Sequence, residues 1–129
     1  LGLDQSVQFT GGLYGADRLA AMVDADLFAA PSQYEIFGLA PCEALMCGAP
    51  VLVTAGSAAG ELLQQAGAAW LAPYGEPAAL GQALLAALSA PDRSQQMVQA
   101  GQAFVRNHLG WPCIVQKLEE VYAGQLAAA

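Results

Sequence analysis

Two glutamates, Glu35 and Glu43, lie eight positions apart around a Phe-Gly-Leu turn, in one of the most apolar stretches of the sequence. A carboxylate can accept hydrogen bonds from two vicinal hydroxyl groups, such as those of a ribose or a hexose. Gly38, between the two glutamates, allows a ligand to approach the backbone closely because glycine has no side chain. The residue types and their spacing therefore indicate binding of vicinal hydroxyl groups.

The same stretch predicts a loop that runs into a helix over about residues 40–47. Glu35 then lies in the loop, and Glu43 lies in the first turn of the helix. The backbone N–H groups of about residues 37–39 have no intrahelical acceptor, so they can hold phosphate oxygens without a lysine. Together with the two carboxylates, these donors suggest recognition of a sugar nucleotide.

Each glutamate also has a purely structural explanation. A glutamate in the first turn of a helix offsets the helix dipole, and Glu43 fits that role. Glu35 fits an ordinary solvated loop position. Residue spacing alone leaves the structural and the functional explanation open for both residues.

Overall charge limits the kinds of partner. The 129 residues carry a net charge of −7, and the fixed cations are Arg18, Arg93, Arg106 and Lys117. Nucleic-acid backbones are bound by basic stripes, which this sequence lacks, so we expect no nucleic-acid partner. Any bound phosphate must rely mainly on backbone N–H groups and helix dipoles, or on another segment.

The three cysteines, Cys42, Cys47 and Cys113, are odd in number and form no C-x-x-C pair. This pattern favours reduced thiols and argues against a disulfide framework or a metal site. No signal peptide is visible and no apolar run reaches the length of a membrane helix. We expect a cytoplasmic location, with peripheral attachment of a longer enzyme to the inner membrane left open.

Short apolar runs alternate with helical patterns along the chain. This alternation predicts an α/β fold: a Rossmann-like parallel sheet of about four strands with flanking and C-terminal helices. Ser89 is expected to be the N-cap of a late helix, Gly48 the C-cap of the helix after Glu35, and Trp70 and Trp111 packing residues. The expected strands are 7–10, 27–30, 50–54 and 69–72, and the expected helices are 15–24, 40–47, 59–65, 77–88, about 91–109 and 112–125.

Residues 31–54 resemble the E-x7-E signature of retaining, nucleotide-sugar-dependent glycosyltransferases of family 4, which have the two-domain GT-B architecture. The resemblance covers most of the chain. Ile36 and the Ala-Pro-Cys at residues 40–42 depart from the usual pattern, and neither removes a ligand group. The matching positions are Pro31, Ser32, Glu35, Phe37, Gly38, Glu43, Ala44, Gly48, Pro50 and Val51.

The resemblance implies roles for five residues. Glu43 would bind the ribose hydroxyls of the donor, and Glu35 would face the transferred sugar as the catalytic residue. The backbone amides of Phe37, Gly38 and Leu39 would contact that sugar and the phosphates. No metal or other cofactor is implied, since the nucleotide sugar is itself the substrate.

The resemblance also implies that residues 1–129 are a single partial domain. Members of the family carry an amino-terminal acceptor domain, and their donor domain opens with two further strand–helix units. Those units hold the Arg and Lys that stabilise the departing diphosphate, and Arg18 matches no such position. We therefore expect a fragment that is inactive alone, with exposed sheet edges that favour self-association.

Two other function classes stay open at this point. One is a different enzyme on the same architecture, such as a sugar-nucleotide epimerase, because a fold does not determine a reaction. The other is a non-catalytic interaction module derived from such an enzyme.

Overall fold

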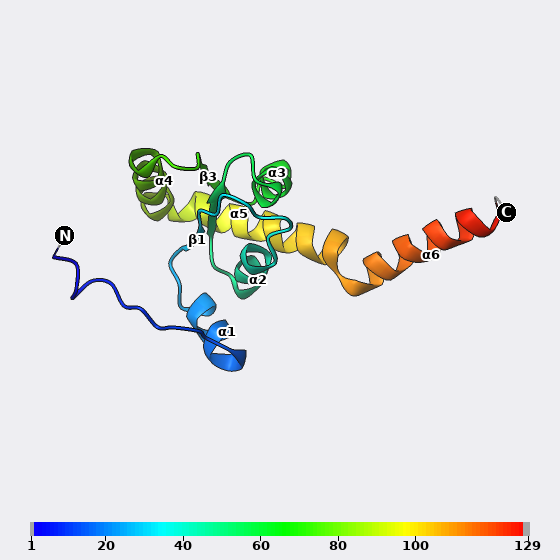
Figure 1. The fold of residues 1–129 in the computed structure, drawn as a ribbon, viewed down its shortest axis with the longest axis horizontal. Helices are drawn as coiled ribbons and strands as arrows, with labels where there is room; N and C mark the ends of the chain where they lie inside the picture. The colour runs from blue at the N-terminus through cyan, green and yellow to red at the C-terminus, as the bar shows by residue number, and fades with distance from the viewer. Residues whose placement is uncertain (1, 128–129) are drawn as a thin grey trace.

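Three short parallel strands form the centre of the computed structural model, which describes residues 2–127 (Figure 1). Strand β1 spans Phe28–Ala30, β2 spans Val51–Thr54 and β3 spans Trp70–Ala72, and they lie side by side in the order β1-β2-β3. The predicted α/β class with a parallel sheet is confirmed. Leu1, Ala128 and Ala129 of the expected domain lie outside the described residues.

Strand β2 is the central strand, and all four of its residues are buried. Its register places Val51 opposite Phe28 on one side, and Leu52 opposite Trp70 on the other. A continuous apolar run is typical of a parallel strand that is covered on both faces. The Val-Leu-Val-Thr sequence therefore belongs in the middle of the sheet.

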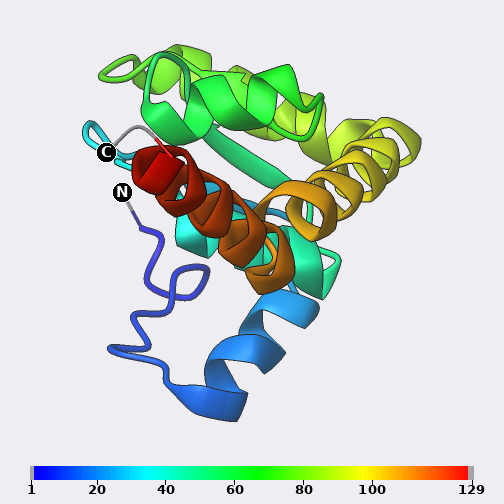
Figure 2. The same cartoon turned by 90° about the vertical axis from the view of Figure 1, so that its right-hand side faces the viewer.

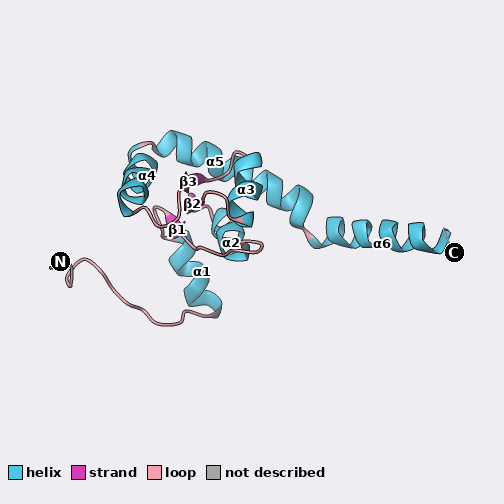
Figure 3. Ribbon diagram, turned by 45° about the horizontal axis from the view of Figure 1, so that its top comes forward, coloured by secondary structure: helices cyan, strands magenta, loops and turns pink. Residues whose placement is uncertain are grey.

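Helices surround the sheet (Figure 3). Helices α2, α3 and α4 pack against its strands, while α5 packs against α2 and α4. Helix α5 runs directly into a π-helical turn, η1, and Gly110 then separates η1 from the last helix. The bounds are α1 Gly15–Val23, α2 Leu39–Cys47, α3 Ala58–Gln65, α4 Pro77–Ser89, α5 Pro91–Phe104, η1 Val105–Leu109 and α6 Trp111–Ala127.

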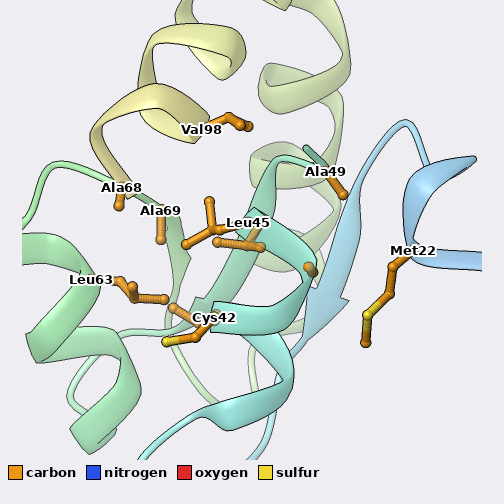
Figure 4. Close-up of a cluster of buried hydrophobic side chains, with 11 residues drawn as sticks. Met22, Cys42, Leu45, Ala49, Leu63, Ala68, Ala69 and Val98 are labelled. Carbon is orange, nitrogen blue, oxygen red and sulfur yellow. The ribbon is translucent and has the colours of Figure 1, made fainter. Parts of the chain in front are cut away.

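The core lies where α2 and α3 meet the sheet and α5 packs on α2 (Figure 4). Leu45 from α2 and Leu63 from α3 are fully buried, and Val98 from α5 is 1% exposed. Gly101 lets α5 approach α2, because a Cβ at that position would lie 2.8 Å from Leu45 Cδ1. Burial of these side chains fixes the position of α2, whose first turn begins the candidate site.

The predicted strand at residues 7–10 is wrong. This segment has no regular structure and trails away from the helices (Figure 1). Phe9 is 95% exposed and Val7 is 49% exposed. Within the described residues β1 pairs with β2 alone, and no strand offers hydrogen bonds to residues 7–10. Without a partner, an apolar run of this length gains neither a ladder nor burial.

The prediction for Gly48 is confirmed and that for Ser89 is wrong. Gly48 has a φ of 96° and caps α2, with the next N–H, that of Ala49, donating to Ala44 O at 3.0 Å. Ser89 is the last residue of α4, and Ala90 stands between α4 and α5. The break falls at Ala90 because the residue before a proline is pushed out of the helical conformation.

The two tryptophans differ. Trp70 packs as predicted: its indole N–H donates to Ser94 Oγ at 3.0 Å, and the Arg93 guanidinium lies 4.7 Å from its ring centre. Trp111 is 79% exposed, so its prediction as a packing residue is wrong. It opens α6, which projects away from the sheet in Figure 1. Within residues 2–127, no helix has the length and apolar character needed to cross a membrane.

Candidate functional site

The loop between β1 and α2 brings Glu35 to the start of α2. Gly38 is the N-cap, with φ 80° and ψ 45° in the left-handed region, and its N–H donates to Glu35 Oε1 at 3.0 Å. One of the amides expected to be free is therefore occupied by Glu35. Within residues 2–127 the N–H groups of Phe37 and Leu39 have no acceptor. The start of α2 thus offers unpaired donors beside a partly used carboxylate.

The missing side chain of Gly38 makes room for helix α3. Gly38 is buried, and a Cβ built on it would lie 2.6 Å from the Cβ of Ala59. Helix α3 begins at the same place, where its N-cap Ser57 accepts the Gly60 N–H at 3.0 Å and donates to Thr54 O at 2.7 Å. The N-termini of α2 and α3 therefore meet beyond the carboxyl end of β2.

Glu43 is the fifth residue of α2, so the expectation that it lies in the first turn is wrong. Helix α2 begins at Leu39, and no acidic residue stands in its first turn. Since the dipole effect falls off within one turn, dipole stabilisation no longer explains the glutamate. Instead its Oε2 atom pairs with Nη1 of Arg18, from helix α1. Both side chains are about two-fifths exposed, at 41% for Glu43 and 42% for Arg18.

An apolar groove of about 460 Å³ lies beside this ion pair. It brings together Phe37, Leu39 and Glu43 among the predicted site residues, whereas Glu35 and Gly38 are not in its lining. Sequence reasoning missed the other lining residues, because they come from α1, α2, η1 and α6 and share no spacing. The missed residues are Leu19, Cys42, Met46, Cys47, Val105, Leu109 and Trp111.

The ion pair was also missed, for the same reason. Arg18 and Glu43 are 25 positions apart, and they meet because α1 packs against α2. In Figure 2, α1 lies at the edge of the molecule next to α2. The one sequence signal that could have indicated this pair was weak: Arg18 is the one lysine or arginine before residue 93, so it is the one fixed cation near Glu43 in the sequence.

Burial also affects a thiol next to the site. Desolvation raises the pKa of Cys42, and the negative charge of Glu43 raises this pKa further. The Cys42 thiol is therefore neutral at physiological pH, which suits a small apolar residue in the core. Within the described part of the chain, no three His, Cys, Asp or Glu side chains gather as metal ligands would.

The sequence matches a known protein family and curated proteins of known name. Residues 1–104 match the profile of the family described as Glycosyl transferases group 1. The chain is 33% identical over 122 residues to a phosphatidyl-myo-inositol mannosyltransferase of Mycobacterium leprae, covering 94% of this chain and 32% of that protein. It is 31% identical over 127 residues to a D-inositol 3-phosphate glycosyltransferase of Salinispora tropica, covering 98% of this chain and 26% of that protein.

A solved structure is similar as well. The sucrose-phosphate synthase of Thermosynechococcus elongatus superposes with a TM-score of 0.82 at 27% sequence identity. The match covers 98% of this chain and 32% of that one. The matched region is between about a quarter and a third of the length of these three proteins, from 26% to 32%.

Proposed function

Because this chain belongs to the glycosyl transferases group 1 family, we propose that it is the donor-binding part of a retaining glycosyltransferase. Such an enzyme moves a sugar from a nucleoside diphosphate to an acceptor. The sheet and its flanking helices match a GT-B Rossmann-like fragment. One observation carries the proposal of donor binding: Glu43 lies at an apolar groove, on the helix whose N-terminus offers unpaired N–H donors.

Each predicted site residue has a role in this proposal. The Glu43 carboxylate accepts hydrogen bonds from the ribose hydroxyls of the donor. The amides of Phe37 and Leu39, at the positive end of α2, bind the diphosphate or the sugar. Glu35 holds the Gly38 amide with Oε1, which orients its carboxylate and leaves Oε2 to face the transferred sugar as the catalytic residue. Gly38 contributes the close packing on α3 that keeps this turn in place.

Transfer also requires positive charge at the diphosphate as it leaves. The chain spans less than a third of its relatives, and its cations, apart from Arg18, follow residue 92. We therefore propose that these residues are part of a donor domain, that further segments supply the acceptor site and the diphosphate cations, and that the chain alone is inactive.

The test of the site is a titration of the full-length protein that carries this chain with UDP-, GDP- and ADP-sugars by calorimetry. Glu43→Ala should weaken binding of the preferred donor by about 1–3 kcal/mol, because charge-assisted hydrogen bonds to the ribose are lost. Glu119→Ala is the matched control, since Glu119 is an exposed residue of α6, away from the groove. Equal donor affinity for Glu43→Ala and Glu119→Ala would rule out the ribose role.

The reaction class is tested separately, by measuring nucleoside diphosphate release with and without an acceptor. Release that depends on the acceptor supports a transferase, whereas conversion of the donor sugar without acceptor indicates an epimerase. The acceptor panel should include phosphatidyl-myo-inositol and D-inositol 3-phosphate, because two relatives are named for these compounds. Anomeric analysis of the product by NMR reports retention or inversion.

The remaining expectations are part of the same proposal. Donor binding should be unchanged by EDTA, because the proposed contacts need no metal. The free edge of β1 should favour self-association, and a monomer by light scattering with cooperative unfolding would contradict this. The cytoplasmic location stays a prediction.

A further inference from the structure

Arg18 and Glu43 form the one ion pair between side chains found within residues 2–127. Arg18 lies on α1, outside the stretch that carries the predicted site, and none of the proposed roles uses it. Surface ion pairs that are this exposed contribute little to folding stability, because water screens them. Stability therefore does not explain why the pair is present at the groove.

The packing of α1 directs Arg18 toward α2. Met22 is 7% exposed and belongs to the hydrophobic core, and it lies four positions after Arg18 in the same helix. Residues four apart lie on one face of a helix, so burial of Met22 turns Arg18 toward α2. The Arg18 side chain then meets Glu43 at the groove.

The contact leaves the carboxylate available for a ligand. Nη1 of Arg18 binds Oε2 of Glu43, and within residues 2–127 no protein group donates to Oε1. A carboxylate has about four acceptor positions on its two oxygens. One guanidinium contact therefore favours one orientation of the Glu43 carboxylate and leaves acceptor positions for two hydroxyl groups.

The positive charge of Arg18 has a second effect on the Glu43 carboxylate. The chain has a net charge of −7, and a nucleotide sugar brings a negatively charged diphosphate toward Glu43. A carboxylate with no counter-ion would repel that diphosphate, and the guanidinium offsets this repulsion. The pair can thus present a hydroxyl-binding carboxylate to an anionic ligand.

We propose that Arg18 is a positioning residue for the donor: it holds the Glu43 carboxylate in the orientation that accepts the ribose hydroxyls and neutralises its charge beside the diphosphate. This inference rests on the proposed function. It goes beyond that function because it assigns a role to a residue of α1, outside residues 31–54, which carry all the site residues proposed above.

The experiment measures donor affinity and steady-state kinetics in the full-length protein that carries this chain, using whichever of UDP-, GDP- or ADP-glucose binds most tightly. Arg18→Met keeps the aliphatic stem and removes the charge, and it should weaken donor binding roughly three- to fivefold. The donor KM should rise by the same factor while kcat stays unchanged. Arg18→Lys should restore most of the affinity, and Lys117→Met is the control for a change in net charge.

A double-mutant cycle separates positioning from a structural effect. In a Glu43→Gln background, Arg18→Met should cause no further loss of donor affinity. The effect of Arg18→Met should also be smaller for the uncharged nucleoside of the chosen donor, because the nucleoside carries no diphosphate to be repelled. A variant that acts only on the fold would weaken binding equally in both backgrounds.

The outcomes distinguish the two proposals. If Glu43→Gln weakens donor binding but Arg18→Met does not, the positioning role is refuted and the proposed function stands. If the unmodified protein binds no nucleotide sugar, or Glu43→Gln changes nothing, the proposed function and this inference fail together. Folding of each variant is checked by circular dichroism. If Arg18→Met does not fold, Arg18→Gln replaces it, and unchanged affinity in that variant refutes the inference.

Discussion

Adding a methyl group at Gly38 tests whether contact between the starts of α2 and α3 maintains the candidate site. The Gly38→Ala substitution introduces two separate difficulties. The residue has a φ of 80°, a region that side chains with a Cβ rarely adopt. The new Cβ would also lie 2.6 Å from the Cβ of Ala59, a residue that is only 1% exposed.

The expected magnitude is the sum of these two effects. Left-handed backbone conformation disfavours alanine relative to glycine by about 1–2 kcal/mol. Carbon atoms pack at about 3.5–4.0 Å, so the contact must open by roughly 1 Å between two buried surfaces. Overpacking of this kind costs about 1–3 kcal/mol. We expect Gly38→Ala to lower the free energy of unfolding by about 2–5 kcal/mol.

Urea unfolding followed by far-UV circular dichroism measures this loss, and Gly48→Ala is its matched control. Gly48 also has a positive φ, 96°, but a Cβ there would meet no atom within 4 Å. Only the conformational loss of about 1–2 kcal/mol is therefore expected at position 48. In the Gly38→Ala, Ala59→Gly double variant the nearest remaining atom of residue 59 lies at 3.5 Å, an ordinary contact distance. The steric part of the loss should disappear there.

Two results would refute this reasoning. One is an equal loss of stability in Gly38→Ala and Gly48→Ala. The other is a steric loss that persists after Ala59→Gly has removed the opposing methyl group. Either result would mean that contact with α3 does not constrain the turn at Gly38.

Four further predictions concern the surroundings of the site. Ser57→Ala should lower the free energy of unfolding, measured with urea, by about 1–2 kcal/mol because the N-cap of α3 is lost. The control is Ser89→Ala, at an exposed position, which should change this free energy by less than about 0.5 kcal/mol. Leu45→Ala should lower the free energy of unfolding by about 2–5 kcal/mol in the same assay, since Leu45 of α2 is fully buried against α5. A loss near zero would mean that this core is not packed as described. Cys42 should be alkylated by iodoacetamide more slowly than Cys113, because the Cys42 thiol is buried and its raised pKa keeps it protonated, whereas the Cys113 residue is half-buried. The pKa of Cys42 is higher in the folded than in the unfolded protein, so burial of this thiol contributes its full stability below the ordinary thiol pKa. This contribution is lost as the pH rises through the folded pKa, and urea unfolding measured across alkaline pH should show the loss.

Much of the fold could be predicted from local sequence. The apolar run at residues 50–54 predicted a strand, and Gly48 predicted the end of α2, because both signals depend on a few neighbouring residues. The strand at residues 7–10 was predicted wrongly, since a strand also needs a hydrogen-bonding partner that its own sequence does not reveal. The exact break between α4 and α5 was missed by one residue, because Ser89 is a good N-cap type but Pro91 decides the conformation of Ala90.

The sequence by itself determined the chemistry on offer at Glu35–Glu43: two carboxylates, a glycine turn and the start of a helix, all within nine consecutive residues. Side-chain type and short-range spacing are sufficient for that conclusion. The tertiary structure alone decided that Arg18 pairs with Glu43, that Gly38 packs on Ala59, and that residues of α1, η1 and α6 line one groove with α2. These contacts join residues far apart in the chain, and they form because burial of the Met22 and Leu45 side chains draws their helices onto one core.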